Sequence, residues 1–75
     1  MRIVFGYESF GLGEKIREVR QLSPNPLTDL AAKAGISTPH WNRIENEKVK
    51  ELPLETLRGI ELALGVDFGV GKSHE

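Results

Sequence analysis

The hydrophobic positions between residues 12 and 64 recur with the period of an α-helix, in separate blocks. The first block places four apolar residues on one helical face: Leu12, Ile16, Val19 and Leu22. This spacing predicts a helix over about residues 12–22. The later blocks predict three more helices, over about residues 26–34, 37–46 and 53–64. The chain is therefore expected to be mainly helical.

Residue types that start and stop helices separate these blocks. Asn25 suits an N-cap ahead of Pro26, and Ser37 suits the N-cap of the third helix. Gly35 is expected to end the second helix, because glycine takes positive φ without steric cost. Asn46 is expected to end the third, because asparagine tolerates the left-handed conformation. The result is two short helices joined by a turn at Gly35.

The two ends of the chain follow a different pattern. Residues 3–7 are rich in strand-forming types, and residues 66–70 alternate between apolar residues and small or polar ones. One hypothesis is that the two ends pair as a small two-stranded antiparallel ribbon, and the alternative is that both ends are frayed. The chain is then divided into an extended N-terminal arm (1–11), a helical domain (12–68) and a C-terminal tail (69–75).

Composition bounds the function more than it identifies it. Seventy-five residues allow one domain, and the absence of cysteine excludes disulfides and thiolate zinc sites. No apolar run approaches membrane-spanning length, so we expect no membrane partner and a cytoplasmic location. The net charge of −1 gives no support to nucleic-acid binding, but residues 33–50 are mildly basic and residues 51–67 acidic.

Two motif fragments do not indicate an enzyme. Gly71-Lys72-Ser73 resembles the end of a phosphate-binding loop, but Val66 stands where the first glycine is needed. Asp67-Phe68-Gly69 resembles a kinase triplet, but 75 residues cannot hold a kinase fold. His40 and His74 alone do not make a metal site. We therefore expect no catalytic activity, no cofactor and no metal.

Six segments of the chain form a recognisable pattern: Leu12–Arg20, Leu30-Ala31, Ala34-Gly35-Ile36-Ser37, Arg43-Ile44-Glu45, Glu55-Thr56-Leu57 and Ala63-Leu64-Gly65-Val66. In their order and spacing, the chain resembles the Cro/lambda-repressor (XRE) family of helix-turn-helix domains over about residues 12–68. The resemblance implies an all-α, compact lambda-repressor-like bundle of four to five helices. It also implies a prokaryotic, nucleoid-associated repressor that binds double-stranded DNA as a homodimer.

The third helix is expected to enter the major groove of DNA. The residues expected to face the bases are Thr38, Pro39, Asn42 and Arg43. Arginine matches the two acceptors of guanine, and asparagine can pair with adenine. The residues expected near phosphates are Asn25, Leu27, Ser37, His40, Lys48 and Lys50. The alternative for each of these polar side chains is a solvated surface group, and that alternative stays open.

Other residues are expected to hold the helices in place. The resemblance implies that Arg20 and Glu45 meet across the first and third helices. Ala31 lets helices approach closely, and Trp41 and Ile44 share the core face of the third helix. Together with the turn at Gly35, these residues would set the position of the DNA-reading helix.

The chain departs from the family pattern in four places. Leu27 stands where many members have a DNA-contacting glutamine, and Pro39 lacks a side-chain hydrogen bond at a position that often reads a base. Glu47 replaces a common glycine and brings negative charge near the phosphates, and the 68–75 segment replaces the usual fifth helix. The first three departures and the acidic balance favour an alternative function: a protein-interaction module on the same scaffold, such as an antitoxin or an adaptor with a toxin or other protein partner.

Overall fold

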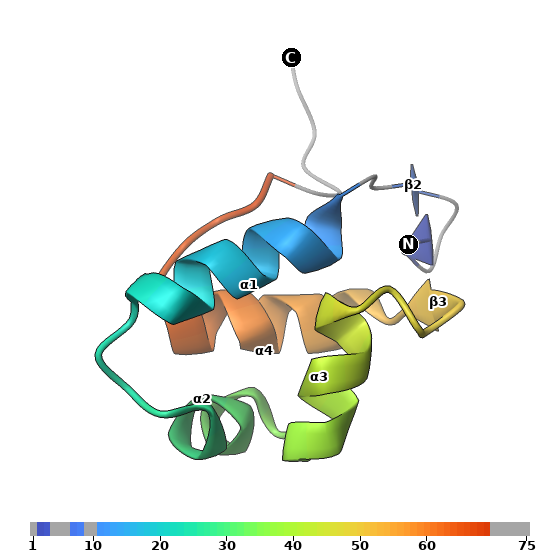
Figure 1. Cartoon of the computed structure of the whole chain (residues 1–75). Coiled ribbons are helices and arrows are strands. Elements are labelled where there is room, and N and C mark those ends of the chain that lie inside the picture. The colour runs from blue at the N-terminus through green and yellow to red at the C-terminus, as the bar shows by residue number, and fades with distance from the viewer. Residues whose placement is uncertain (1, 4–6, 9–10, 70–75) are drawn as a thin grey trace.

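The computed structural model describes residues 2–3, 7–8 and 11–69. Within them lie four helices: α1 (Leu12–Leu22), α2 (Leu27–Ala34), α3 (Thr38–Glu45) and α4 (Leu54–Leu64). Three two-residue strands accompany them: β1 (Arg2–Ile3), β2 (Tyr7–Glu8) and β3 (Glu51–Leu52). Figure 1 shows the helices gathered into one bundle, with the strands at one end of it. The all-α fold class expected from the sequence is confirmed.

One continuous apolar core joins the four helices. Helix α2 packs on α4, and α3 packs on both α1 and α2. The fully buried side chains come from every helix and from β3: Leu12, Ile16, Leu30, Trp41, Ile44, Leu52, Leu57 and Ile60. Since the apolar stripes of the sequence meet in this cluster, the helical periodicity accounts for the packing.

Two glycines allow helices to approach more closely than a side chain would permit. A Cβ atom added at Gly13 would lie 2.5 Å from the carbonyl oxygen of Glu45, at the end of α3. A Cβ atom added at Gly59 would lie 2.8 Å from the carbonyl oxygen of Ala34, at the end of α2. Glycine inside a helix costs conformational entropy, and here the close contact between helices is what it permits.

The strands form a small sheet in the order β2-β1-β3. Strand β1 is antiparallel to β2, with Ile3 opposite Tyr7, and parallel to β3, with Ile3 opposite Leu52. The hypothesis that the two ends of the chain pair with each other is therefore wrong for the described residues. Residues 66–69 contain no strand, and Val70 lies outside the described residues.

Local hydrogen bonds explain why residues 66–69 do not join the sheet. The Phe68 N–H donates to Glu61 Oε2 at 2.8 Å, and the Gly69 N–H donates to Asp67 Oδ1 at 2.7 Å. These backbone donors are bound by side chains, so they are not offered to a neighbouring strand. Strand β3, by contrast, is anchored by the buried side chain of Leu52 and offers its backbone to β1.

The ends of two helices differ from expectation. Helix α2 begins at Leu27, and its N-cap is Pro26 rather than Asn25, because the Pro26 carbonyl accepts from the Leu30 N–H at 3.1 Å. Asn46 does end α3, but its φ is −91°, and the left-handed residue is Glu47, with φ 59°.

The apolar face of α1 is shorter than the sequence pattern suggested. The side chain of Leu22 is 86% exposed, although it was expected on the core face. At 3.6 residues per turn, Leu22 lies roughly 80° around the helix from Leu12 and roughly 120° from Ile16. The spacing in the sequence groups Leu22 with the apolar positions of α1, but its angle around the helix axis places its side chain outside the core.

Candidate nucleic-acid interface

Helices α2 and α3 form a helix-turn-helix whose turn is set by two residues. Gly35 ends α2 with φ 79°, and the Ile36 N–H donates to the Ala31 carbonyl at 3.0 Å. Ser37 then begins α3, since its Oγ accepts from the His40 N–H at 3.2 Å. A glycine with positive φ followed by a serine N-cap lets the chain change direction sharply within a few residues.

Helix α3 has a buried face and an exposed face. Trp41, Ile44 and Glu45 are buried against α1 and α2, at the i, i+3, i+4 spacing of one helical face. Asn42 and Arg43 are exposed on the other side. Pro39 is also exposed, in the first turn, whereas Thr38 and His40 are half-buried. Of the four residues expected to face bases, Pro39, Asn42 and Arg43 are therefore accessible on α3, and Thr38 is only partly accessible.

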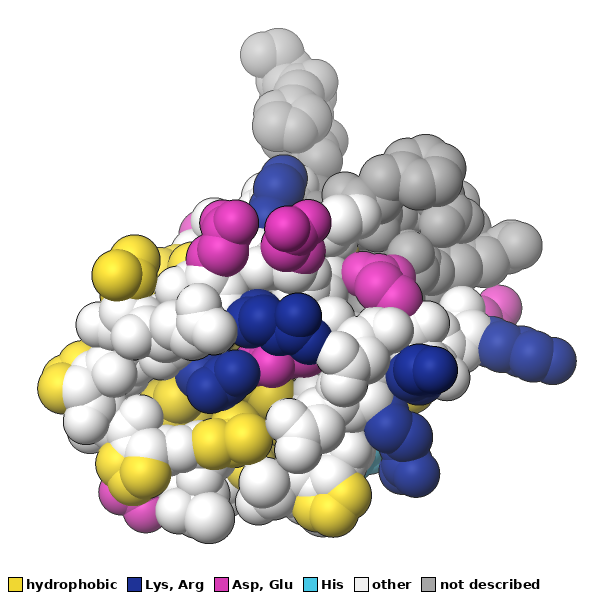
Figure 2. Space-filling model, viewed as in Figure 1, with side chains coloured by type: hydrophobic (Ala, Val, Ile, Leu, Met, Phe, Trp, Pro, Cys, Tyr) yellow, Lys and Arg dark blue, Asp and Glu magenta, His cyan; other side chains and the backbone are white. Residues whose placement is uncertain are grey.

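The residues expected near phosphates lie at the start of α2, at the start of α3 and in the loop after α3. Asn25 is exposed ahead of α2, and Lys48 and Lys50 are exposed in the loop between α3 and β3. Figure 2 shows Lys and Arg side chains along the side of the molecule where α3 and this loop lie. Leu27 is half-buried and packs against the core, and Ser37 uses its hydroxyl as the cap of α3.

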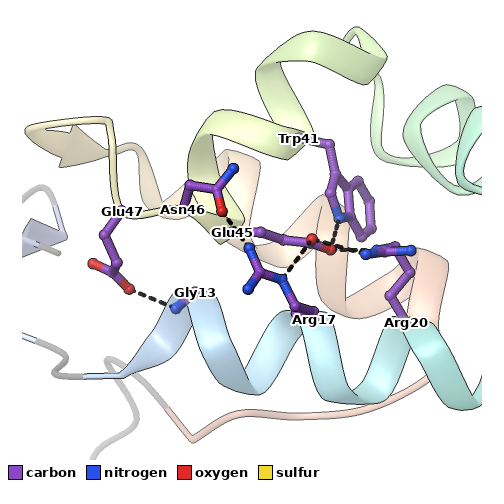
Figure 3. A network of polar contacts seen from close by, with 7 residues as sticks. All are labelled: Gly13, Arg17, Arg20, Trp41, Glu45, Asn46 and Glu47. Carbon is purple, nitrogen blue, oxygen red and sulfur yellow. Dashed lines mark hydrogen bonds and ion pairs between the residues drawn. The ribbon is translucent and has the colours of Figure 1, made fainter.

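A polar network fixes α3 on α1, and Glu45 is at its centre (Figure 3). The Glu45 side chain is 2% exposed. Its Oε2 accepts from Arg20 Nε and, at 2.7 Å, from Trp41 Nε1. Its Oε1 accepts from Arg20 Nη2 at 3.0 Å and from Arg17 Nε at 3.5 Å. Arg20 and Glu45 thus meet across α1 and α3, and the indole donor adds a contact that spacing alone did not indicate.

Burial and hydrogen bonding act in opposite directions on Glu45. Burial raises the pKa of this carboxyl, but the hydrogen bonds from Arg20 and Trp41 and the Arg20 charge outweigh it and hold the pKa below its ordinary value. The hydrogen bond to Glu45 raises the pKa of Arg20, against a smaller opposing effect of burial. Both groups are therefore charged at neutral pH, and the pair is an ionic one.

Two further contacts join the end of α3 to α1. The Arg17 guanidinium donates to Asn46 Oδ1, and Glu47 Oε2 accepts from the Gly13 N–H at 2.6 Å (Figure 3). Sequence reasoning treated Glu47 only as a negative charge near phosphates and missed its position at the start of α1. The signal was Gly11, which occupies the N-cap of α1 without a side chain that could cap it.

We also searched the described part of the chain for metal sites, membrane-spanning helices and grooves. No group of three or more His, Cys, Asp or Glu that could hold a metal occurs among the described residues. No helix among the described residues is long and apolar enough to cross a membrane. A shallow groove at the end of α4 is lined by Arg58, Glu61, Leu62 and Val66, and it includes none of the predicted DNA-facing residues.

Comparison with known proteins identifies the same helix-turn-helix. A family model for the Cro/C1-type HTH DNA-binding domain matches residues 15–69. The matched segment contains the whole of α2, α3 and α4, together with the loop that carries Lys48 and Lys50. No curated protein and no solved structure matches the chain.

Proposed function

Since this chain belongs to the Cro/C1-type family of helix-turn-helix DNA-binding domains, we propose that it is a sequence-specific transcription regulator that reads duplex DNA with α3. The observation that carries the proposal is the exposed face of α3, where Asn42 and Arg43 lie opposite the buried Trp41 and Ile44. Domains of this family bind DNA and do not catalyse reactions. The chemistry is therefore recognition, by hydrogen bonds and charge.

In the proposed complex α3 lies in the major groove. Arg43 offers parallel donors to the O6 and N7 acceptors of guanine, and Asn42 offers an amide to adenine. Thr38, in the first turn, contacts a base edge or a thymine methyl. Pro39 adds only apolar contact, so it contributes shape rather than hydrogen bonds.

The phosphates are held by groups around α3. The proposed contacts are Lys48, Lys50 and His40, with Asn25, Leu27 and Ser37 at the N-terminal ends of α2 and α3. Helix N-termini favour anions, and lysines supply charge without sequence information. Because the net charge of the chain is −1, binding depends on this local arrangement and not on the overall charge.

The proposed working form is a homodimer that represses transcription. A single domain of this size covers little DNA, and two copies related by a two-fold axis would read half-sites about 34 Å apart. A dimer on a symmetric operator occupies promoter DNA and excludes other proteins from it.

The experiment is selection of binding sites from a random duplex pool, followed by affinity measurement for the best site. Arg43→Ala should weaken binding by about 1–3 kcal/mol and relax specificity at one base position. Lys15→Ala is the matched control, because Lys15 is an exposed cation on α1. Its affinity should stay close to that of the wild type. Equal affinity of Arg43→Ala and wild type for the best site would refute the assigned role of Arg43.

A second candidate is a protein-interaction module, such as an antitoxin that binds a toxin. The observation that favours it is the shallow groove at the end of α4, where the exposed apolar side chains of Leu62 and Val66 lie together. Failure of the folded protein to enrich any duplex would favour this candidate. Co-purification with the product of an adjacent small toxin-like reading frame would then test it directly.

A further inference from the structure

Glu47 adopts a backbone conformation that few residues other than glycine tolerate. Its φ of 59° is the only positive φ of a non-glycine residue in the described part of the chain. The surrounding hydrogen bonds require this conformation, since the Glu47 N–H donates to the Ile44 carbonyl at 3.1 Å and the Lys48 N–H donates to the Arg43 carbonyl at 2.8 Å. This pair of bonds is a Schellman motif, in which glycine is the usual residue.

The side chain of Glu47 makes a contact that glycine could not make. Its Oε2 accepts from the Gly13 N–H at 2.6 Å, in the first turn of α1. Helix α1 has no side-chain cap of its own, because Gly11 occupies its N-cap. A carboxylate at this place satisfies a free amide and meets the positive end of the helix dipole. Glu47 thus caps a helix that begins far earlier in the chain.

The contact holds one end of the loop that carries the two lysines. The other end is held by Leu52, which is fully buried and whose strand pairs with β1. Between these anchors Val49 is half-buried and packs against the core, while Lys48 and Lys50 on either side of it are exposed. The loop therefore has a defined path, with both lysines directed outward.

We propose that Glu47 is a positioning residue for DNA binding: by capping α1 it fixes the turn from which Lys48 and Lys50 reach phosphates. This inference rests on the proposed function. The Glu47 charge was expected to weaken DNA binding, because an unbound carboxylate at this place would repel the phosphates. In this proposal, Glu47 instead supports DNA binding. Held at the start of α1, its charge is offset by the helix dipole, and its hydrogen bond orders the loop.

Two substitutions separate charge from position. Glu47→Gln removes the charge but keeps the length and an oxygen that can accept from the Gly13 N–H. Glu47→Asp keeps the charge but is one methylene shorter, so its carboxylate cannot reach the same amide. Aspartate tolerates the left-handed conformation better than glutamate, so weaker binding by Glu47→Asp would not come from backbone strain at this position.

The experiment measures affinity for the best duplex and the amide exchange rate of the Lys48 N–H, under conditions where circular dichroism shows every variant folded. Glu47→Asp should weaken binding about three- to tenfold, since ordering each lysine at the interface becomes more costly. It should also speed exchange at Lys48. Glu47→Gln should bind within about twofold of the wild type and exchange at the same rate.

Two combinations of results would overturn the inference. Tighter binding by Glu47→Gln with unchanged binding by Glu47→Asp would show that only charge matters and would overturn the inference. Lower unfolding stability of Glu47→Asp with unchanged affinity and exchange would reduce Glu47 to a structural residue and also overturn it. If the wild type binds no duplex, the proposed function itself fails. Exchange at Lys48 then decides separately whether Glu47 orders the loop.

Discussion

Replacing Glu45 with glutamine tests whether the ionic network holds α3 in place. Glutamine has the shape of glutamate, but only one of its two polar ends accepts hydrogen bonds. In the folded protein both carboxylate oxygens accept, one from Arg20 and Trp41 and the other from Arg20 and Arg17. Whichever way the amide is oriented, its NH₂ group faces an arginine donor. The substitution therefore removes hydrogen bonds to Arg20 and places the NH₂ group of the glutamine against an arginine N–H, so that two donors face each other.

The size of the effect follows from burial. Removing one partner of a buried ion pair costs about 3–5 kcal/mol, because the remaining charge is left without compensation. Glu45 is 2% exposed but Arg20 is 24% exposed, so the guanidinium can recover some hydration. We therefore expect Glu45→Gln to lower the free energy of unfolding by about 2–4 kcal/mol. A domain of this length has a total stability of only about 4–11 kcal/mol, so the loss is large.

The assay is urea unfolding at several pH values, followed by circular dichroism and by the fluorescence of Trp41. The folded-state pKa of Glu45 lies below the ordinary value of 4.5, so its ionised form contributes stability that is fully present above pH 4.5. That contribution is lost as the pH falls through the lowered pKa. Glutamine does not titrate, so the gap between wild type and variant should be constant near neutral pH and should narrow in acid.

The exposed Glu18→Gln is the matched control, since it removes a carboxylate from α1 outside the network. Its stability should stay within about 0.5 kcal/mol of the wild type. A Glu45→Gln variant as stable as the wild type at pH 7 would refute the reasoning. A difference in the free energy of unfolding that does not narrow below pH 4 would also refute the reasoning, because the carboxylate charge would then not contribute to that difference.

Three further predictions concern packing and capping. Gly59→Ala should lower stability by about 1 kcal/mol or more in urea unfolding, because the added methyl meets the Ala34 carbonyl oxygen at 2.8 Å and this outweighs the better helix propensity of alanine. A more stable Gly59→Ala would contradict the close approach. Ser37→Ala should cost about 1 kcal/mol in thermal unfolding by removing the α3 cap, whereas Ser37→Asp should retain it. Leu22→Gln should leave stability unchanged in the same assay, since Leu22 is 86% exposed, and a clear loss would place Leu22 in the core after all.

Much of the fold was predictable because its information is local. The periodic apolar positions gave all four helices, and Ser37 and Gly35 carry their capping signals in their own residue types. The exposed face of α3 follows from the same periodicity, since Trp41 and Ile44 fix which side is buried. Whether Asn42 and Arg43 touch bases stays a prediction, because exposure is necessary for contact but does not establish it.

The rest depends on contacts between distant residues, which a single sequence does not display. Two-residue strands are too short to show a period, so the pairing of β1 with β3 had no signal. The bond between Glu47 and Gly13 joins residues 34 positions apart. The Trp41 donor needs the rotamer of a buried indole, which packing decides. Leu22 is exposed because of its angle around the axis of α1, and counting positions in the sequence does not resolve that angle.

The parallel pairing of β1 with β3 has a consequence for the order of folding. Joining Ile3 to Leu52 closes a loop that contains α1, α2 and α3, and the entropic cost of closure grows with loop length. The helices form from neighbours in the chain and need no such closure, so the bundle is expected to assemble first and the sheet last. By the same reasoning the sheet opens first. A brief local opening would then separate β1 from β3, while the buried side chain of Leu52 still holds this end of the lysine-bearing loop on the intact helices.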